Sequence, residues 1–307
     1  MITILMIVLQ VLVVLLVAPL VTGLVRWVKA RLQGRRGAVP WLVYFALLTT
    51  LKKENVISES RSWMFRLVPF VVLGTILFLV VTLPLIFSDG GLAQIDLFVL
   101  AGVLALGSIF LVFGGLDAAT AFGGMGASRE MTLATLIEPA VLTTFAGFAV
   151  VAGSSSVQAI FGQGMTVVSH PALLLSFAAL VLITLAENAR YPVDNPATHL
   201  ELTMVHEAMI LEYSGPYLAM LEYASSIKLT VFMLILGNLI WVQPVSAFDL
   251  STIGMAVLGV LVTVVVGSCL LALLESSMAK MRFFRMQEYL SVAFFLAFAG
   301  LILTLIV

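Results

Sequence analysis

Apolar residues gather along the chain in eight continuous runs that are separated by polar segments. The runs cover approximately residues 2–25, 67–87, 97–115, 131–151, 172–186, 227–242, 252–274 and 289–307. A helix needs about 20 apolar residues to cross a bilayer core about 30 Å thick, and most of the runs have this length. They do not alternate with a period of two, which excludes a transmembrane β-barrel. The pattern predicts an all-α polytopic membrane protein with about eight transmembrane helices, forming a single transmembrane domain over residues 1–307.

The composition agrees with this fold class. Apolar residues make up 62% of the chain and charged residues 10%, against roughly a quarter charged in soluble domains. This balance excludes a cytosolic enzyme, a nucleic-acid-binding protein and a disordered chain. It indicates that the partners of the chain include the lipid bilayer. Cys269 is the single cysteine, so the chain cannot form an internal disulfide or hold an iron–sulfur cluster by itself.

The basic residues predict the orientation. Alternate loops, at about 26–66, 116–130, 187–226 and 275–288, together with Lys228 at a helix edge, hold all 15 Lys and Arg residues. Cytoplasmic loops carry such an excess, so we expect these loops inside the cell and both termini outside. The first cation, Arg26, follows the first apolar run, which predicts an uncleaved helix instead of a signal peptide.

Two cytoplasmic segments carry local patterns. Residues 41–51 are apolar but too short to span a bilayer, which predicts a helix that lies at the interface or re-enters the membrane. This helix is either a surface anchor or the wall of a cavity that opens toward the cytoplasm. Residues 114–130 are rich in glycine but lack a Gly-Lys-Ser/Thr ending, so we expect close helix packing there and not a nucleotide site.

Two acidic residues lie on the predicted fourth transmembrane helix. Glu130 and Glu138 are eight residues apart, which places them near one helix face. Glu138 lies about two turns inside the membrane, where an unpaired carboxylate costs several kcal/mol. Either Glu138 forms an ion pair, for example with Arg129, or it belongs to a protonatable relay.

The loop at 187–226 is the most acidic part of the chain. It contains one cation, Arg190, and six carboxylates: Glu187, Asp194, Glu201, Glu207, Glu212 and Glu222. Crowding and burial both raise carboxylate pKa values, so we expect some of these groups to exchange protons near neutral pH. The alternative is a solvated acidic loop, which the interleaved Leu, Met, Val and Tyr residues disfavour.

Two histidines lie in the same loop. His199 and His206 are seven residues apart, and a carboxylate is near each of them. The zinc-protease pattern is absent because no second histidine follows His206 after four residues. We therefore predict hydrogen-bonded or proton-carrying histidines and no metal site.

Several motifs together resemble a known family. The chain reads ENARYPVD at 187–194 and EYSG at 212–215, with RLQGRRG at 31–37, SWMFRLVP at 62–69 and GASRE at 126–130. These stretches resemble the membrane subunit that respiratory complex I places at its quinone site. GASRE and the upstream Gly115-Leu-Asp117 are more similar to the branch found in formate hydrogenlyase and energy-converting [NiFe]-hydrogenases.

The resemblance implies a membrane subunit in a prokaryotic cytoplasmic (inner) membrane. It would anchor a peripheral redox arm made of hydrogenase-like large and small subunits and an iron–sulfur subunit, beside antiporter-like membrane subunits. The nickel–iron site and the iron–sulfur clusters would lie in those partners, and this chain would bind no cofactor. A quinone is left open as a ligand, although the residues after Gly37 depart from the family pattern.

The resemblance also implies residue roles. Four arginines would either dock the peripheral arm or set the pKa values of neighbouring carboxylates: Arg35, Arg36, Arg129 and Arg190. Protons would move along a relay formed by Glu130, Glu138, Glu187, Asp194, Glu201, Glu207 and Glu212, with Asp117 as a weaker member.

Three functions remain open from the sequence. The first is a coupling and anchoring subunit of a hydrogenase-type complex that moves protons or sodium ions. The second is the quinone-site subunit of a complex I-like dehydrogenase. The third is an independent secondary transporter, which is disfavoured because the chain shows no self-similar halves.

Overall fold

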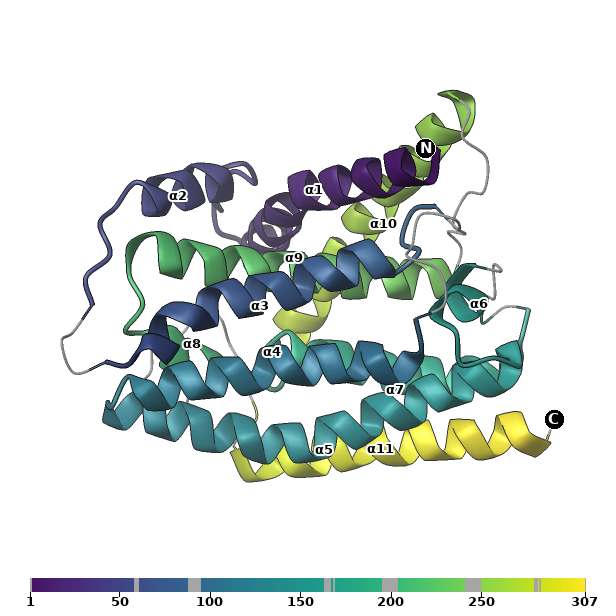
Figure 1. Cartoon of the computed structure of the whole chain (residues 1–307). Helices are drawn as coiled ribbons and strands as arrows, with labels where there is room; N and C mark the ends of the chain where they lie inside the picture. The colour runs from purple at the N-terminus through teal and green to yellow at the C-terminus, as the bar shows by residue number, and fades with distance from the viewer. Residues whose placement is uncertain are drawn as a thin grey trace.

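The computed structural model describes residues 2–57, 61–87, 95–162, 167, 169–194, 204–240, 250–278, 281 and 283–306, and these residues are almost entirely helical. The long helices lie side by side as a bundle, and both termini lie at the same end of it (Figure 1). In chain order the elements are α1 Ile2–Leu32, α2 Leu42–Leu51, α3 Trp63–Thr82, α4 Leu97–Asp117, α5 Ala121–Ala152, α6 Val157–Gly162, the 3-10 helix Pro171–Leu173, α7 Leu174–Glu187, α8 His206–Ile210, α9 Gly215–Ile240, α10 Leu250–Ser277 and α11 Phe283–Ile306.

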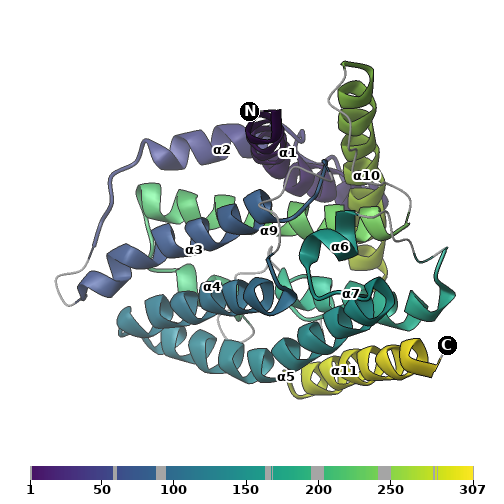
Figure 2. The same ribbon diagram turned by 45° about the vertical axis from the view of Figure 1, so that its right-hand side comes forward.

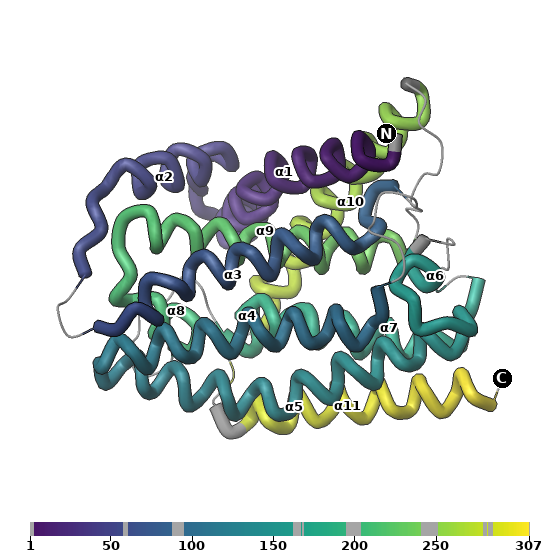
Figure 3. The backbone as a smooth tube through the Cα atoms, viewed as in Figure 1, coloured from purple at the N-terminus to yellow at the C-terminus, as the bar shows by residue number. Residues whose placement is uncertain are grey.

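The eight predicted transmembrane helices correspond to α1, α3, α4, α5, α7, α9, α10 and α11. Seven of them are long and apolar enough to cross a membrane, and the eighth, α7 with its preceding 3-10 turn, is a shorter apolar helix. The expected all-α membrane fold with about eight spans is therefore confirmed. The shared end of the two termini, also visible along the backbone tube in Figure 3, agrees with an even number of crossings.

Several helices continue past the apolar runs that predicted them. The glycine-rich segment expected in a loop at 116–130 is helical from Ala121, so only a short turn separates α4 from α5. Thr120 caps α5 by accepting a hydrogen bond from the Gly123 amide, as N-cap threonines do. The loop boundary was misplaced because apolar length reports the part of a helix in hydrocarbon, while backbone hydrogen bonding continues beyond it.

The glycines of this segment allow the close packing that the sequence predicted. A Cβ on Gly123 would lie 2.3 Å from the carbonyl oxygen of Gly115, and a Cβ on Gly126 would lie 2.9 Å from that of Val205. Tertiary packing thus keeps glycines in a helix that propensity alone disfavours.

The apolar segment at 41–51 forms the separate helix α2, which lies outside the bundle at the end opposite the termini (Figure 1). Its Tyr44 hydroxyl donates a hydrogen bond to the carbonyl of Leu16 in α1. At the other end of the bundle, Gln10 of α1 donates to the carbonyls of Val80 and Leu83, at 2.7 and 2.8 Å, and so holds the end of α3.

Candidate functional site

A polar cavity lies inside the bundle, between α3, α4, α5, α7, α8 and α9. Its volume is about 60 Å³, and its titratable lining residues are Glu130, Glu187, His206 and Lys228. A single water needs roughly 10–15 Å³ of such space and two to four polar partners. The cavity therefore has room for a few waters that could bridge these side chains.

An ion pair crosses this cavity. The Lys228 ammonium of α9 lies 2.5 Å from a carboxylate oxygen of Glu187 at the end of α7, and both side chains are largely shielded from solvent. Burial strengthens such a pair because the surroundings screen it less than water does. Lys228 thereby fixes Glu187 at the point where α7 meets the acidic segment.

A second cavity, of about 250 Å³, lies between α4 and α5 and is lined by Glu138 and again by Glu187. Glu138 is on the exposed side of α5, one residue before Pro139. Glu130 and Glu138, which were predicted to lie near one face of the helix, line different cavities. Glu187 lines both, so one residue of α7 borders the cavity of each of the two α5 carboxylates.

Asp194 and His206 join the acidic segment to α8. The Asp194 carboxylate is buried and accepts hydrogen bonds from the amides of Val205, at 3.2 Å, and His206, at 3.4 Å. Burial, helped by the positive charge of Lys228 and opposed by Asp194, lowers the pKa of His206 to about 4. His206 is therefore neutral at physiological pH and can accept or donate through either ring nitrogen.

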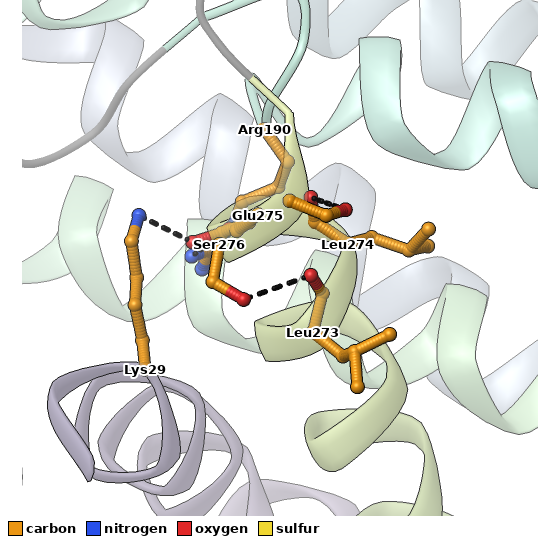
Figure 4. Close-up of polar contacts among 7 residues, drawn as sticks. Lys29, Arg190, Leu273, Leu274, Glu275 and Ser276 are labelled. Carbon is orange, nitrogen blue, oxygen red and sulfur yellow. Dashed lines mark hydrogen bonds and ion pairs between the residues drawn. The ribbon is translucent and has the colours of Figure 1, made fainter. Parts of the chain in front are cut away.

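Lys29, Arg190 and Glu275 form a buried ionic cluster (Figure 4). Glu275, in the last turn of α10, has a side chain that is 2% exposed, and its two oxygens lie 2.9 Å from Lys29 Nζ and 3.3 Å from Arg190 Nη1. Burial lowers the pKa of Arg190, and Glu275 opposes that shift. Lys29 also lies 4.3 Å from the ring centre of Tyr191, a cation–π contact.

A further pair lies near the connection between α2 and α3. Arg61 donates to Glu212 at 2.7 Å and lies over the ring of Phe65, which stacks on Tyr213 at 3.9 Å. Burial, followed by the nearby negative charge of Asp117, raises the pKa of Tyr213. Asp117 itself accepts a hydrogen bond from the Ser62 amide at 3.1 Å.

The remaining predicted residues lie in different settings. Arg35 and Arg36 are exposed just after α1, while Arg129 donates to the carbonyl of Met204 at 2.9 Å. Glu207 lies on α8 and interacts electrostatically with Arg190. His199 and Glu201 lie outside the described residues.

The structure groups Glu130, Glu187, Asp194 and His206 around one end of the bundle. Glu138 lines a second cavity, which Glu187 also lines. Among the residues that the structure describes, no three His, Cys, Asp or Glu side chains gather as metal ligands.

Sequence reasoning missed four charged members of the site: Lys29, Arg61, Lys228 and Glu275. Lys228 and Lys29 counted only toward orientation, and Glu275 only as a loop boundary. A signal was available for Glu275 and Lys228, because each interrupts or ends an otherwise apolar helix, where charges are usually paired or functional.

Comparisons with known proteins agree with this architecture. The sequence model of the NADH dehydrogenase family matches residues 4–305. The chain is 32% identical over 280 residues to formate hydrogenlyase subunit 4 of Escherichia coli K12, a match that covers 89% of each chain. It is 33% identical over 228 residues to hydrogenase-4 component C of the same organism, covering 72% of this chain and 70% of that relative.

A solved structure shares the fold. A chain of the membrane-bound sulfane sulfur reductase, an archaeal respiratory membrane complex, superposes with a TM-score of 0.85, covering 99% of this chain and all of that one at 18% identity. Because the family model matches residues 4–305, nearly the whole sequence, this multi-pass membrane protein belongs to the NADH dehydrogenase family.

Proposed function

We propose that the chain is an integral membrane subunit of a hydrogenase-type, complex I-like respiratory complex. It anchors a peripheral redox arm and couples the electron transfer of that arm to proton, or sodium-ion, translocation. The names of its Escherichia coli relatives, a formate hydrogenlyase subunit and a hydrogenase component, support this assignment. The observation that carries the coupling role is that Glu187 lines both the polar cavity inside the bundle and the cavity beside Glu138.

The relay that we propose runs from the acidic segment to the exposed side of α5. Protons enter near Asp194 and His206, pass by way of cavity waters among Glu130 and Glu187, and leave through Glu138. The Lys228 ammonium lies against the Glu187 carboxylate, so a proton that arrives on Glu187 would weaken that ion pair. Glu201, Glu207, Glu212 and Asp117 would extend the relay toward the arm, with His199 and His206 as proton carriers.

The anchoring role is assigned to the end of the bundle that carries α2 and α8 (Figure 1). The exposed Arg35 and Arg36 belong to the segment between α1 and α2. In this proposal that end faces the cytoplasm and both termini face outward, as the distribution of Lys and Arg indicates. The hydrogenase-like large and small subunits and the iron–sulfur subunit would dock there and hold the nickel–iron site and clusters. An antiporter-like subunit would cover Glu138, because an exposed carboxylate at membrane depth is costly without a partner.

The partners are tested by gentle purification from the native membrane followed by mass spectrometry. A large partner with two Cys-x-x-Cys pairs supports the hydrogenase-type assignment. A related large partner without those cysteines would favour the quinone-site alternative instead. Recovery of no redox partner would contradict the proposal.

The relay is tested with Glu187→Gln and Glu138→Gln in the assembled complex. Both variants should keep electron transfer measurable with an artificial donor while losing most proton uptake into inverted vesicles. The control is Glu288→Gln, which changes an exposed carboxylate on α11 that lines neither cavity. Unchanged proton transport in correctly assembled Glu187→Gln and Glu138→Gln complexes would refute the relay.

A further inference from the structure

Three of the described helices contain an internal proline: Pro19 in α1, Pro69 in α3 and Pro139 in α5. Because proline has no backbone N–H, each of them leaves the carbonyl four residues earlier without its usual helical donor. Lipid offers no hydrogen-bond donor in the hydrocarbon region, so each of these carbonyls needs a donor from protein or water.

Two of the three carbonyls find their donor inside this chain. The carbonyl of Leu15, four residues before Pro19, accepts a hydrogen bond from the Tyr223 hydroxyl at 2.9 Å. The carbonyl of Phe65, four residues before Pro69, accepts one from the Tyr213 hydroxyl at 3.2 Å. Side chains of α9 and of the segment before it therefore complete the interrupted helices α1 and α3.

The third carbonyl, that of Thr135, lies on the outside of the bundle. Thr135 is exposed, and no side chain in the described ranges donates a hydrogen bond to its carbonyl. Glu138 is also exposed, and its position three residues later places it on the same helix face. None of the described ion pairs includes it. Two acceptors thus lie together on this face of α5 without a donor from this chain.

Both acceptors lie at membrane depth. Glu138 precedes the end of α5 at Ala152 by roughly 21 Å, at about 1.5 Å per residue. This distance falls within a hydrocarbon core about 30 Å thick. A carboxylate at such a depth is costly without a partner, so the missing donor has to come from a neighbouring molecule.

The adjoining face of α4 is shaped to let another helix approach. The two helices run side by side in Figure 1 and Figure 2, and the cavity of about 250 Å³ between them is lined on α4 by Ala101, Gly102 and Ala105. A Cβ on the exposed Gly102 would meet nothing within 4 Å, so packing inside this chain does not require a glycine there. Small residues of this kind let transmembrane helices pack closely.

We propose that this face of α4 and α5 binds a transmembrane helix of a neighbouring subunit, and that a lysine of that helix pairs with Glu138 and donates to the carbonyl of Thr135. A lysine ammonium has three donors and no acceptor, so it can serve both groups, whereas a tyrosine hydroxyl has a single donor. The Lys228–Glu187 pair is an ion pair of the same type within this chain. The inference rests on the proposed function, because it requires membrane partners, and it adds the position and the chemistry of one contact.

The ion pair is tested by zero-length cross-linking of the intact complex, purified from native membranes. A hydrophobic carbodiimide couples a carboxyl group to an amine that touches it, and mass spectrometry locates the resulting amide. We expect an amide between Glu138 and a lysine in a transmembrane helix of another subunit. Glu138→Gln should abolish it, while Glu288→Gln, the exposed control on α11, should leave it unchanged.

The close approach is tested by a matched pair of glycine substitutions. Gly102→Leu and Gly74→Leu both change an exposed helical glycine whose added Cβ would meet nothing within 4 Å, and Gly74 does not line the cavity. Gly102→Leu should lower the amount of the neighbouring subunit that is retained per copy of this chain about tenfold, because it overpacks the contact between the helices. Gly74→Leu should leave it unchanged.

The outcomes separate this contact from the proposed function. If the redox arm is recovered but Glu138 couples to phosphatidylethanolamine, to a second copy of this chain or to nothing, the contact is refuted and the proposed function stands. Equal retention of the neighbouring subunit in the two glycine variants would also refute the contact. If a lysine of another membrane subunit couples to Glu138 but no redox arm is recovered, the contact is supported and the proposed function is contradicted.

Discussion

The buried ionic cluster allows a quantitative test in Glu275→Gln. This substitution keeps the shape of the side chain but removes the charge that Lys29 and Arg190 share at 2.9 and 3.3 Å. With an effective dielectric constant near 20, these separations correspond to gross attractions of about 6 and about 5 kcal/mol. Desolvation of the ions offsets much of this gain, but breaking a buried pair from one side costs about 3–5 kcal/mol, because the other charge stays buried.

The same cluster predicts a smaller effect for Lys29→Met. This variant leaves the Arg190–Glu275 pair, which is electrically balanced, so the loss should be close to that of one charged hydrogen bond, about 2 kcal/mol. In the double variant Glu275→Gln/Lys29→Met, one of the two uncompensated cations is gone. The combined cost should therefore be at least about 1 kcal/mol below the sum of the two single costs.

The free energy of unfolding is measured by reversible SDS titration in mixed micelles, followed by tryptophan fluorescence. Glu288→Gln is the control, and an exposed change of this kind should stay within about 0.5 kcal/mol of the wild type. The reasoning is refuted if Glu275→Gln costs less than about 1 kcal/mol, or if Lys29→Met costs as much as Glu275→Gln.

Two further predictions use the same unfolding measurement. Burial lowers the pKa of His206 to about 4 in the folded state, below an unfolded value of about 6.5. The unfolded state therefore binds more protons between these two pH values. Stability that is present above pH 6.5 is lost as the pH falls toward 4. The loss should reach about 3 kcal/mol and be absent in His206→Gln; a pH-independent difference between the two proteins would contradict it. Gly23→Ala should cost about 1–3 kcal/mol by overpacking, because its Cβ would lie 2.1 Å from the backbone carbonyl oxygen of Pro40. A Cβ on Gly124 would meet nothing within 4 Å, so Gly124→Ala should be neutral or stabilising by up to about 1 kcal/mol. Equal effects of the two glycine substitutions would show that the contact between α1 and Pro40 is unimportant.

The helices were predictable from the sequence because hydrocarbon imposes one requirement on every spanning segment, namely internal backbone hydrogen bonding by apolar residues. This requirement located all eight helices and the separate helix α2. Helix ends were less predictable. Gly123 and Gly126 look like loop residues in isolation, and only their contacts with the backbone of Gly115 and Val205 explain why α5 begins before them.

The acidic residues of the candidate site could be predicted from the sequence, but the ion pairs that they form could not. The acidic segment and Glu130 stood out because carboxylates are rare in this chain, and Glu130, Glu187 and His206 do line one cavity. Their cationic partners could not be inferred, since Lys29 and Glu275 are 246 residues apart and Lys228 and Glu187 are 41 apart. Only the packing of α1 and α9 against α10 and α7 brings these charges together, and no spacing rule within one helix reports such contacts.

The two ends of the bundle are held together by different chemistry. At the end that carries the termini, neutral side chains form the contacts. Gln10 donates hydrogen bonds to carbonyls at the end of α3, and Asn238 donates to the carbonyl of Leu85 at 3.0 Å. At the opposite end, the described ion pairs join α1, α7, α9, α10 and the segments next to them. The described ion pairs are therefore confined to one half of the molecule. A relay built from the charged groups of that half reaches Glu138 at the side of α5, and no ion pair among the described residues continues from Glu138 toward the termini. We therefore expect the proton to leave this chain sideways, into a neighbouring subunit, and the isolated chain to be proton-tight in liposomes.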